Sequence, residues 1–485
     1  MKRFILALSL CLTALSGFAT DYYCSPSGTG DGSSYQKPGD FTTLLNALKP
    51  GDVLYCLEGQ YNYTNTISIT LCGTADKPIT ICRAPGEYPV FDFRKQAYGK
   101  RGFQIQVGAN YLHFKGLTVR YTGKNAIHNS GSYNTFEDLD VYGNGDTGIQ
   151  MKAGGNNLIL NCDSHDNFDY MLSGDFGGNA DGFADKQYTG GGNIYRGCRA
   201  WNNSDDGWDF YQRVSQSGTM TIMENCVCYK NGPAYYDMRN HPRYETDKSW
   251  FDQFINGKSV EQRNHGTVYV TLDHYYNNGN GNGFKLGGGY TKNVVRAAYC
   301  LAVANTVKGF DQNNNDGTME IYNCTAWNNG QDYGFYNTDN GQVTAKNNIS
   351  LGNSYIFARP NAVNVNNSWN IAGITCDESD FQSLDDSQIL VDRLDDGSLP
   401  ETTFMRLVEG SDLIDRGLDL GLGYPFSGTA PDLGCFEYVA PTAIRQLPAS
   451  GNSTSPVIYH DLQGRKVHNP THGLYIVNGH KLVVL

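Results

Sequence analysis

A short unit recurs through the middle of the chain, and its spacing limits the folds that the sequence can adopt. Each unit is a β-prone run, a turn residue such as Asn or Gly, and then a small or apolar residue. The equivalent positions are Leu117, Leu139, Cys162, Cys198, Cys226, Cys300, Cys324 and Asn348, so the steps in sequence number are 22, 23, 36, 28, 74, 24 and 24. A recurring unit of about 22 to 25 residues is typical of one coil of a stacked parallel β-solenoid. The longer steps indicate coils with inserted loops, and we expect the step from Cys226 to Cys300 to hold at least one extra coil.

A second strand follows each of these units after a turn, and it begins with glycine and a large apolar residue. The pairs are Gly148-Ile149, Gly182-Phe183, Gly207-Trp208, Gly283-Phe284, Gly309-Phe310 and Gly334-Phe335. Because side chains alternate between the two faces of a strand, the large residues are predicted to point inward and stack, and their neighbours to point outward.

The cysteines fall into two groups. Those at repeat positions, Cys162, Cys198, Cys226, Cys300 and Cys324, would form an inward column, and we interpret them as small core residues rather than as disulfides or metal ligands. Four others, Cys24, Cys56, Cys72 and Cys82, lie near the N-terminus, where we expect one or two disulfides of undetermined pairing.

The composition supports an all-β fold and excludes some partners. The 57 glycines and 33 tyrosines, with only 18% charged residues, favour short strands and tight turns over long helices. The net charge of -12 gives no indication of nucleic-acid binding.

The ends of the chain indicate export and a modular plan. Lys2 and Arg3 precede an apolar run, and Gly17-Phe18-Ala19 resembles a signal-peptidase site, so a cleaved signal and a secreted or exported monomer without a transmembrane segment are expected. A short helix from Phe41 to Leu48, with Asp40 as its N-cap, is predicted to cover the open end of the solenoid. The plan is a signal peptide (1–19), a main domain (20–439) with an N-terminal cap (20–99), regular coils (100–350) and C-terminal coils or cap (351–439), a linker (440–456) and a small β tail (457–485).

Four aspartates form the strongest candidate site. Aligned by Gly182 and Gly207, Asp181 and Asp206 take the same position in successive coils, roughly 4.8 Å apart if the coils are hydrogen-bonded neighbours. Asp205 and Asp209 belong to the same turn and strand as Asp206. Carboxylates that close repel one another unless a cation lies among them, and an all-oxygen ligand set favours Ca²⁺.

Lys285 is the candidate catalytic base. It stands two residues after Gly283, as Asp209 stands two residues after Gly207, so both are predicted to lie in the same column of outward-facing side chains. With one further coil between them, the two would lie roughly 10 Å apart. A lysine near a cation and partly buried has a lowered pKa and can remove a weakly acidic proton.

These motifs together resemble a known enzyme family. The four aspartates, followed by Asn282-Gly283-Phe284-Lys285-Leu286-Gly287-Gly288, are similar to polysaccharide lyase family 9, the right-handed parallel β-helix pectic lyases, over most of the mature chain. The resemblance implies Ca²⁺ held by Asp181, Asp205, Asp206 and Asp209, Lys285 as Brønsted base, and β-elimination of an acidic pectic polysaccharide. This chain departs from the family in its large aromatic insertion and its cysteines.

The substrate and the reaction class stay open at this point. An insertion from Pro233 to Gly266 is rich in aromatic residues, and its Arg239, His241 and Arg243 are candidates for substrate binding. The acidic pI and this insertion favour the rhamnogalacturonan I backbone over homogalacturonan. The alternatives are a hydrolase that uses Asp205 and Asp206 as acid and base, and a non-catalytic glycan-binding solenoid.

Overall fold

In a computed structural model of the chain, the described residues are 19–211, 219–336, 341–352 and 354–440, with four short strands near the C-terminus. The predicted signal peptide, apart from its last residue, and the predicted linker, apart from residue 440, lie outside the described residues. The chain divides into two compact units, Met1–Glu437 and Tyr438–Leu485. Among the described residues, no helix combines the length and apolarity of a bilayer-crossing segment.

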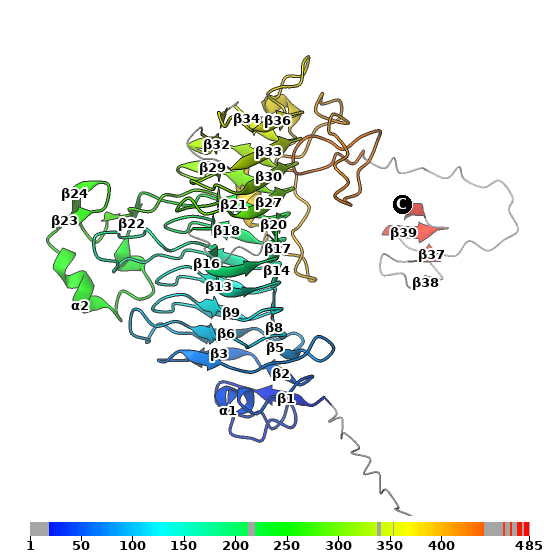
Figure 1. Cartoon of the computed structure of the whole chain (residues 1–485). Helices are drawn as coiled ribbons and strands as arrows, with labels where there is room; N and C mark the ends of the chain where they lie inside the picture. The colour runs from blue at the N-terminus through cyan, green and yellow to red at the C-terminus, as the bar shows by residue number, and fades with distance from the viewer. Residues whose placement is uncertain are drawn as a thin grey trace, which may run out of the picture. The chain divides into compact units, whose positions relative to one another are not determined.

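Three long parallel sheets build the first unit, with one strand of each sheet in most coils (Figure 1). The first sheet contains, in order, β1 (Asp21–Cys24), β2 (Val53–Cys56), β5 (Ile79–Arg83), β8 (Leu112–Lys115), β11 (Thr135–Glu137), β14 (Leu158–Leu160), β17 (Ile194–Arg196), β20 (Thr221–Glu224), β27 (Val294–Ala298), β30 (Thr318–Tyr322), β33 (Gln342–Lys346) and β36 (Val363–Val365). The second contains β3 (Gly59–Asn62), β6 (Pro89–Asp92), β9 (Thr118–Arg120), β12 (Asp140–Tyr142), β15 (Asp163–His165), β18 (Arg199–Trp201), β21 (Val227–Tyr229), β28 (Leu301–Val303), β31 (Thr325–Trp327) and β34 (Ile349–Leu351). The third contains β4 (Ile67–Ile69), β7 (Phe103–Ile105), β10 (Ile127–Asn129), β13 (Ile149–Gly155), β16 (Phe183–Gly191), β19 (Trp208–Asp209), β26 (Phe284–Lys285), β29 (Lys308–Asp311), β32 (Gln331–Phe335) and β35 (Tyr355–Phe357). The predicted parallel β-solenoid is confirmed.

The turn between the first and second sheets explains the repeated turn residue in the sequence. At this corner the chain bends from one sheet to the next at a single residue with positive φ, which is between 48° and 67° in the coils from Gly116 to Asn347. Asn, Asp and Gly occupy most of these corners because they tolerate the left-handed conformation best. The residue that follows, Cys162 for example, then points into the core.

A column of aromatic rings fills the interior beneath the third sheet. Phe183 stacks on Trp208 with ring centroids 4.5 Å apart, Trp208 on Phe284 at 5.0 Å, and Phe284 on Phe310 at 4.9 Å. The predicted inward stack is therefore confirmed for these coils.

The next member of this column corrects the sequence-based register. Tyr333, rather than the predicted Phe335, pairs with Phe310, and its ring stacks on Phe310 at 5.1 Å. Asp332 stands where the earlier coils have glycine, so aligning Gly334 with Gly309 placed this strand two residues out of register. The Tyr333 hydroxyl donates to the carbonyls of Cys324 and Ile349, which satisfies its polar end inside the core.

The long step between Cys226 and Cys300 holds no extra coil, contrary to expectation. Strand β20 pairs directly with β27, β21 with β28 and β19 with β26. The intervening chain forms a projection, which we call the insertion (residues 231–282), drawn in green at the side of the coils (Figure 1). It contains β22 (Tyr235–Tyr236), η1 (Met238–Asn240), α2 (Lys248–Phe251), η2 (Asp252–Phe254), β23 (Lys258–Gln262), β24 (Gly266–Val270) and β25 (Tyr275–Tyr276).

The insertion has its own small core, which it shares with the loop between β15 and β16. The buried members are Phe168, Tyr170, Phe176, Met238, Phe251, Phe254, Val270 and Tyr275. Its apolar runs therefore pair as antiparallel hairpins, β22 with β25 and β23 with β24, instead of joining the parallel sheets.

The cysteine predictions have two outcomes. The repeat-position cysteines are all fully buried and free, which confirms them as small core residues. Cys24, Cys56, Cys72 and Cys82 are also free, so the expected N-terminal disulfides are not formed. Cys24 and Cys56 occupy paired positions of β1 and β2 and belong to the hydrophobic core.

A helix covers the N-terminal end of the solenoid, and the segment after the last coil packs along the side of the middle coils. Helix α1 (Phe41–Leu45) begins at the predicted N-cap, because the Asp40 side chain accepts from the Thr43 amide. It buries Phe41 against the Phe91 ring. Beyond β36 the chain runs through η3 (Glu378–Asp380) and η4 (Asp386–Leu390) and packs back on the coils, where Arg393 binds Asp163.

The second unit is described only as strands. It contains β37 (Tyr459–His460), β38 (Lys466–Val467), β39 (Gly473–Val477) and β40 (His480–Val484). They form one antiparallel sheet in the order β38-β37-β39-β40.

Candidate active site

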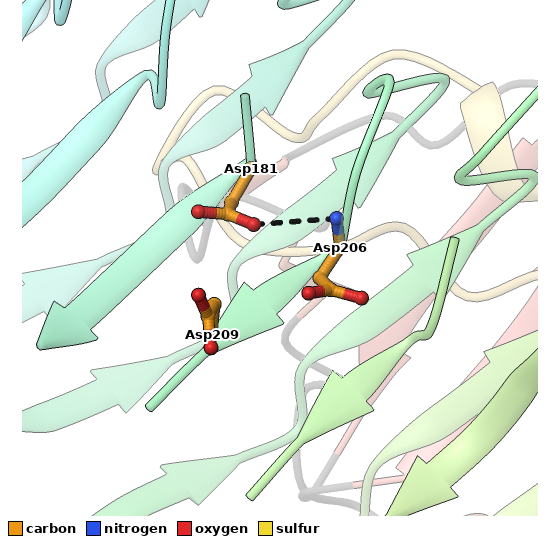
Figure 2. Close-up of side chains that lie close together, drawn as sticks. All are labelled: Asp181, Asp206 and Asp209. Atoms are coloured by element: carbon orange, nitrogen blue, oxygen red, sulfur yellow. Dashed lines mark hydrogen bonds between the residues drawn. The ribbon is translucent and has the colours of Figure 1, made fainter. Parts of the chain in front are cut away.

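Three of the predicted aspartates converge on the third sheet. Asp181 stands two residues before β16, Asp206 two residues before β19, and Asp209 within β19. One carboxylate oxygen from each lies within 4.8 Å of the others, and all three residues are buried. Figure 2 shows the three carboxylates gathered around a common space, with Asp181 bonded to the Asp206 amide. The coil register that aligned Gly182 with Gly207 is confirmed by the pairing of Phe183 with Trp208.

The carboxylates are held by hydrogen bonds from the surrounding turns. The Thr147 hydroxyl donates to Asp181 at 2.8 Å, and the Tyr211 amide donates to Asp209 at 2.9 Å. Asp206 accepts from both the amide and the side chain of Asn282, at 3.0 and 2.7 Å. These donors fix the orientation of each carboxylate before any ligand is bound.

Asp205 lies beside the other three aspartates and lines the polar pocket that is described below. Its Oδ1 accepts from the Asn280 amide at 2.7 Å, and the residue is buried. Burial and the charge of Asp206 raise the pKa of Asp205 to about 8. Burial is the larger of these two causes, and the neighbouring carboxylate adds to it.

Two lysines bind this cluster. Lys285 lies next to Asp209 in the sheet and not one coil further, as the sequence had suggested, because β26 follows β19 directly. Its Nζ is 2.8 Å from Asp206 Oδ2 and 3.5 Å from Asp209 Oδ1. Lys186, which sequence reasoning missed, places its Nζ 2.7 Å from Asp181 Oδ2 and 2.8 Å from Asp209 Oδ2.

The protein's own charges keep Lys285 protonated. Burial lowers its pKa, but Asp206 and Asp209 outweigh burial, and the pKa lies well above that of a free lysine. Burial likewise raises the pKa of Asp209, but Lys186 and Lys285 outweigh it and the pKa is lowered. The two ammonium groups and the Asp209 carboxylate therefore hold each other in charged form.

The donor set fits a hard divalent cation. Every ligand atom at the centre is a carboxylate oxygen, and the described residues bring no cysteine or histidine into it. Oxygen-only ligand sets suit Ca²⁺ or Mg²⁺. Asp181, Asp206 and Asp209 would hold the ion, and Asp205 is next to them.

A polar pocket of about 220 Å³ opens beside the cluster. The coils contribute Lys186, Asp205, Asp209, Tyr211, Lys285 and Asn313 to its lining, and the insertion contributes Arg263, Asn264, His265, Asn278 and Asn280. The exposed Arg263 lies 3.5 Å from Asp175 and supplies positive charge to the rim. The insertion thus forms one wall of the pocket.

The three residues proposed for substrate binding do not line this pocket. Arg243 is fully buried, and its guanidinium donates to four backbone carbonyls and binds Asp247, so it anchors the insertion to the N-terminal coils. Burial lowers the pKa of His241 to about 3, which leaves it uncharged. Arg239 is exposed and paired with Asp237 at 2.7 Å. The structure thus corrects the prediction for Arg243, whose side chain is closed to a substrate.

Lys186 and Arg263 carried different signals in the sequence. Lys186 is two residues after Ala184, which pairs with Asp209, so face alternation places it on the same outward face. Nothing local marks Arg263, because the fold of the insertion brings it to the pocket.

Comparison with known proteins decides the family. The model for the Pel9A-like right-handed β-helix region matches residues 22–243 and 250–367. The chain is 35% identical over 448 residues to pectate lyase L of Dickeya chrysanthemi, covering 89% of this chain and 94% of the relative. The chain belongs to the Pel9A-like family. It is a polysaccharide lyase of family 9 with a right-handed parallel β-helix.

Further relatives agree with this placement. The lyase is 32% identical to pectate lyase L of Paenibacillus polymyxa, covering 83% of this chain and 85% of the relative. The crystal structure of pectate lyase Pel9A superposes with a TM-score of 0.72 and 34% identity, over 87% of this chain and 97% of that one. A rhamnogalacturonan lyase shares the fold, with a TM-score of 0.63 at 24% identity over 81% of this chain and 97% of that one.

Proposed function

We propose that the lyase is a secreted, calcium-dependent pectate lyase that cleaves galacturonate chains by β-elimination. The observation that carries the proposal is the contact between the two functional parts of the site. The ammonium group of Lys285 lies 2.8 Å from one carboxylate of a buried aspartate cluster whose oxygens converge. A base next to a cation site is the arrangement that proton abstraction from a uronate requires.

Lys285 is proposed as the base. It would take the proton from the carbon α to the uronate carboxylate. The new double bond forms as the bond from the β carbon to the glycosidic oxygen breaks; the electron pair of that bond leaves with the oxygen, which takes a proton from water. A bound Ca²⁺ would neutralise the uronate charge and stabilise the enolate-like anion. Because Asp206 and Asp209 keep Lys285 protonated, we expect it to act as a base only when the charge of these carboxylates is neutralised.

The side chains that line the pocket suit an acidic polymer as substrate. Arg263 adds a positive charge on the rim, and the ring of Tyr211 lies under Lys285, with Nζ 5.7 Å from the ring centroid. An aromatic ring beside the base can pack against a sugar face, while the arginine binds a carboxylate of a neighbouring unit.

The substrate we favour is homogalacturonan, which revises the sequence-based preference for rhamnogalacturonan I. That preference rested on the acidic pI and on the aromatic insertion as a contact surface for neutral rhamnose. Many of these aromatic rings, including Phe251, Phe254 and Tyr275, are buried in the insertion's own core. The Dickeya chrysanthemi and Paenibacillus polymyxa relatives are both named pectate lyases.

The test is ultraviolet absorbance of unsaturated uronide product from polygalacturonate and from rhamnogalacturonan I, each with calcium and with a chelator. We expect calcium-dependent absorbance on polygalacturonate at the higher rate. A higher rate on rhamnogalacturonan I would overturn the substrate, and undiminished activity in chelator would overturn the calcium requirement.

A further inference from the structure

The aspartate cluster contains one more cation than the proposed reaction uses. Four buried carboxylates, Asp181, Asp205, Asp206 and Asp209, face two buried ammonium groups, those of Lys186 and Lys285. When all four carboxylates are ionised, the formal charge of the group is two negative units, which one divalent cation balances. Lys285 is accounted for as the base, and Lys186 has no part in that chemistry.

The two lysines divide the carboxylate oxygens between them. Asp209 Oδ1 contacts the ammonium group of Lys285 and Asp209 Oδ2 contacts that of Lys186, so both oxygens already have a cationic partner. Asp181 Oδ2 binds Lys186 and also accepts from the Thr147 hydroxyl. A metal ion bound to Asp209 would lie close to both ammonium groups, and repulsion between these positive charges favours the release of one of the two contacts.

Lys186 is the group placed to give way. It reaches the cluster from β16, where the register against β13 shifts just past Asp185, so its backbone is locally irregular. The pocket, which both lysine side chains line, offers it space outside the cluster. Lys285, in contrast, sits in regular pairing between Asp209 and Asp311.

We propose that Lys186 is a built-in competitor of calcium: its ammonium group holds the carboxylates of Asp181 and Asp209, must release them when the ion binds, and so sets the calcium affinity of the site. This inference rests on the proposed calcium site. It makes Lys186 a positioning residue that acts through the ligands.

The first experiment is titration calorimetry of calcium into chelator-treated mature protein, wild type and Lys186→Met. Methionine is unbranched and matches the apolar stem of lysine, and it removes the charged group. We expect the variant to bind calcium at least about tenfold more tightly, because the ammonium group that competes for two of the ligands is gone. In chelator the variant should melt at a lower temperature than wild type, because the carboxylates have lost a counter-ion, and calcium should raise its Tm by more.

Lys308→Met is the matched control. Lys308 lies on the same sheet and binds Asp311 at 2.8 Å, but it does not contact the cluster. Its removal should leave the calcium affinity within about twofold, as expected for a screened charge outside the site. Calcium affinity that is unchanged or weaker in Lys186→Met would overturn the inference. Wild-type protein that binds no calcium would instead overturn the proposed calcium site.

A second measurement needs no variant. If calcium displaces the ammonium group, the acetylation rate of Lys186 in the wild-type protein, followed by mass spectrometry, should rise when calcium is added, and that of Lys308 should not. An unchanged or reduced rate at Lys186 at saturating calcium would contradict the competition.

Discussion

The same turns of the solenoid stack two kinds of polar side chain, and the difference between them explains where chemistry is possible. One is a ladder of asparagines, all buried except the last, in which each side-chain amide donates to the next at 2.8 to 3.0 Å: Asn144, Asn167, Asn203, Asn231, Asn305 and Asn329. The other is the aspartate cluster, two of whose members, Asp205 and Asp206, follow Asn203 in the same turn.

An amide carries both a donor and an acceptor, so asparagines stacked at the strand spacing satisfy one another and need nothing else. Carboxylates carry acceptors only, so the same stacking leaves them dependent on cations. The asparagine ladder therefore needs no further partner, whereas the buried carboxylates of the cluster need positive charge, which lysines and a metal ion can supply.

The largest expected effect concerns the lysine that serves chemistry. Lys285→Met should lower turnover on polygalacturonate by about 10³-fold, within the range for loss of a general base. Far-ultraviolet circular dichroism should stay unchanged, because β26 lies within the sheet on both sides. Turnover within tenfold of wild type would remove Lys285 from the mechanism.

The second prediction weakens the cluster without changing its shape. Asp209→Asn removes one charge from the carboxylate that both lysines share. Calcium affinity in calorimetry should fall by about 100-fold, since the ligand charge facing the ion is reduced. Affinity equal to wild type would place the ion elsewhere.

The third prediction replaces one amide of the asparagine ladder with a carboxylate, the group that forms the aspartate cluster. Asn305→Asp replaces an amide that donates to Asn329 and accepts from Asn231 with a group that only accepts. Chemical denaturation should show a loss of about 3 kcal/mol or more at neutral pH, because a charged group is buried without a cation.

Asn305→Ala is the matched control for that substitution. It should cost less, about 1–3 kcal/mol, because it leaves neighbouring polar groups unpaired but buries no charge. If the two variants were equally stable, the distinction between amide and carboxylate stacking would fail.

The smallest effect concerns a cation that the protein supplies for itself. His165 stacks between Tyr142 and Trp201; burial lowers its pKa, but hydrogen bonds to Asp140 and Asp166 outweigh this and raise it to about 9. The stabilisation is present below the unfolded pKa of about 6.5 and is lost as the pH rises to about 9. Wild type should therefore lose about 1–2 kcal/mol of stability relative to His165→Gln over that window. Parallel pH dependences would contradict this.

Much of the fold could be predicted because each coil repeats one local rule. A residue that tolerates positive φ at each corner and a glycine before an inward aromatic residue were visible in single coils. The rule failed at Tyr333, where Asp332 replaces the glycine, and in the insertion, where apolar runs pair with each other.

The site was predictable as far as it is local. The positions of Asp181, Asp206 and Asp209 could be predicted from the alignment of successive coils, and that of Lys285 from its place in the column of outward-facing side chains. The direct contact of Lys285 with Asp209 depended on the insertion holding no coil, and the position of Arg263 and the burial of Arg243 depended on how the insertion folds. Long-range packing of this kind leaves no periodic signal in the sequence.

The most direct test is a crystal structure of the lyase grown with calcium, with the ion located by its anomalous scattering. The account predicts one ion bound by Asp181, Asp206 and Asp209 at about 2.3 to 2.6 Å, with Asp205 at or beside the ligand shell. An ion bound elsewhere, or carboxylates still held by both lysines at saturating calcium, would contradict it.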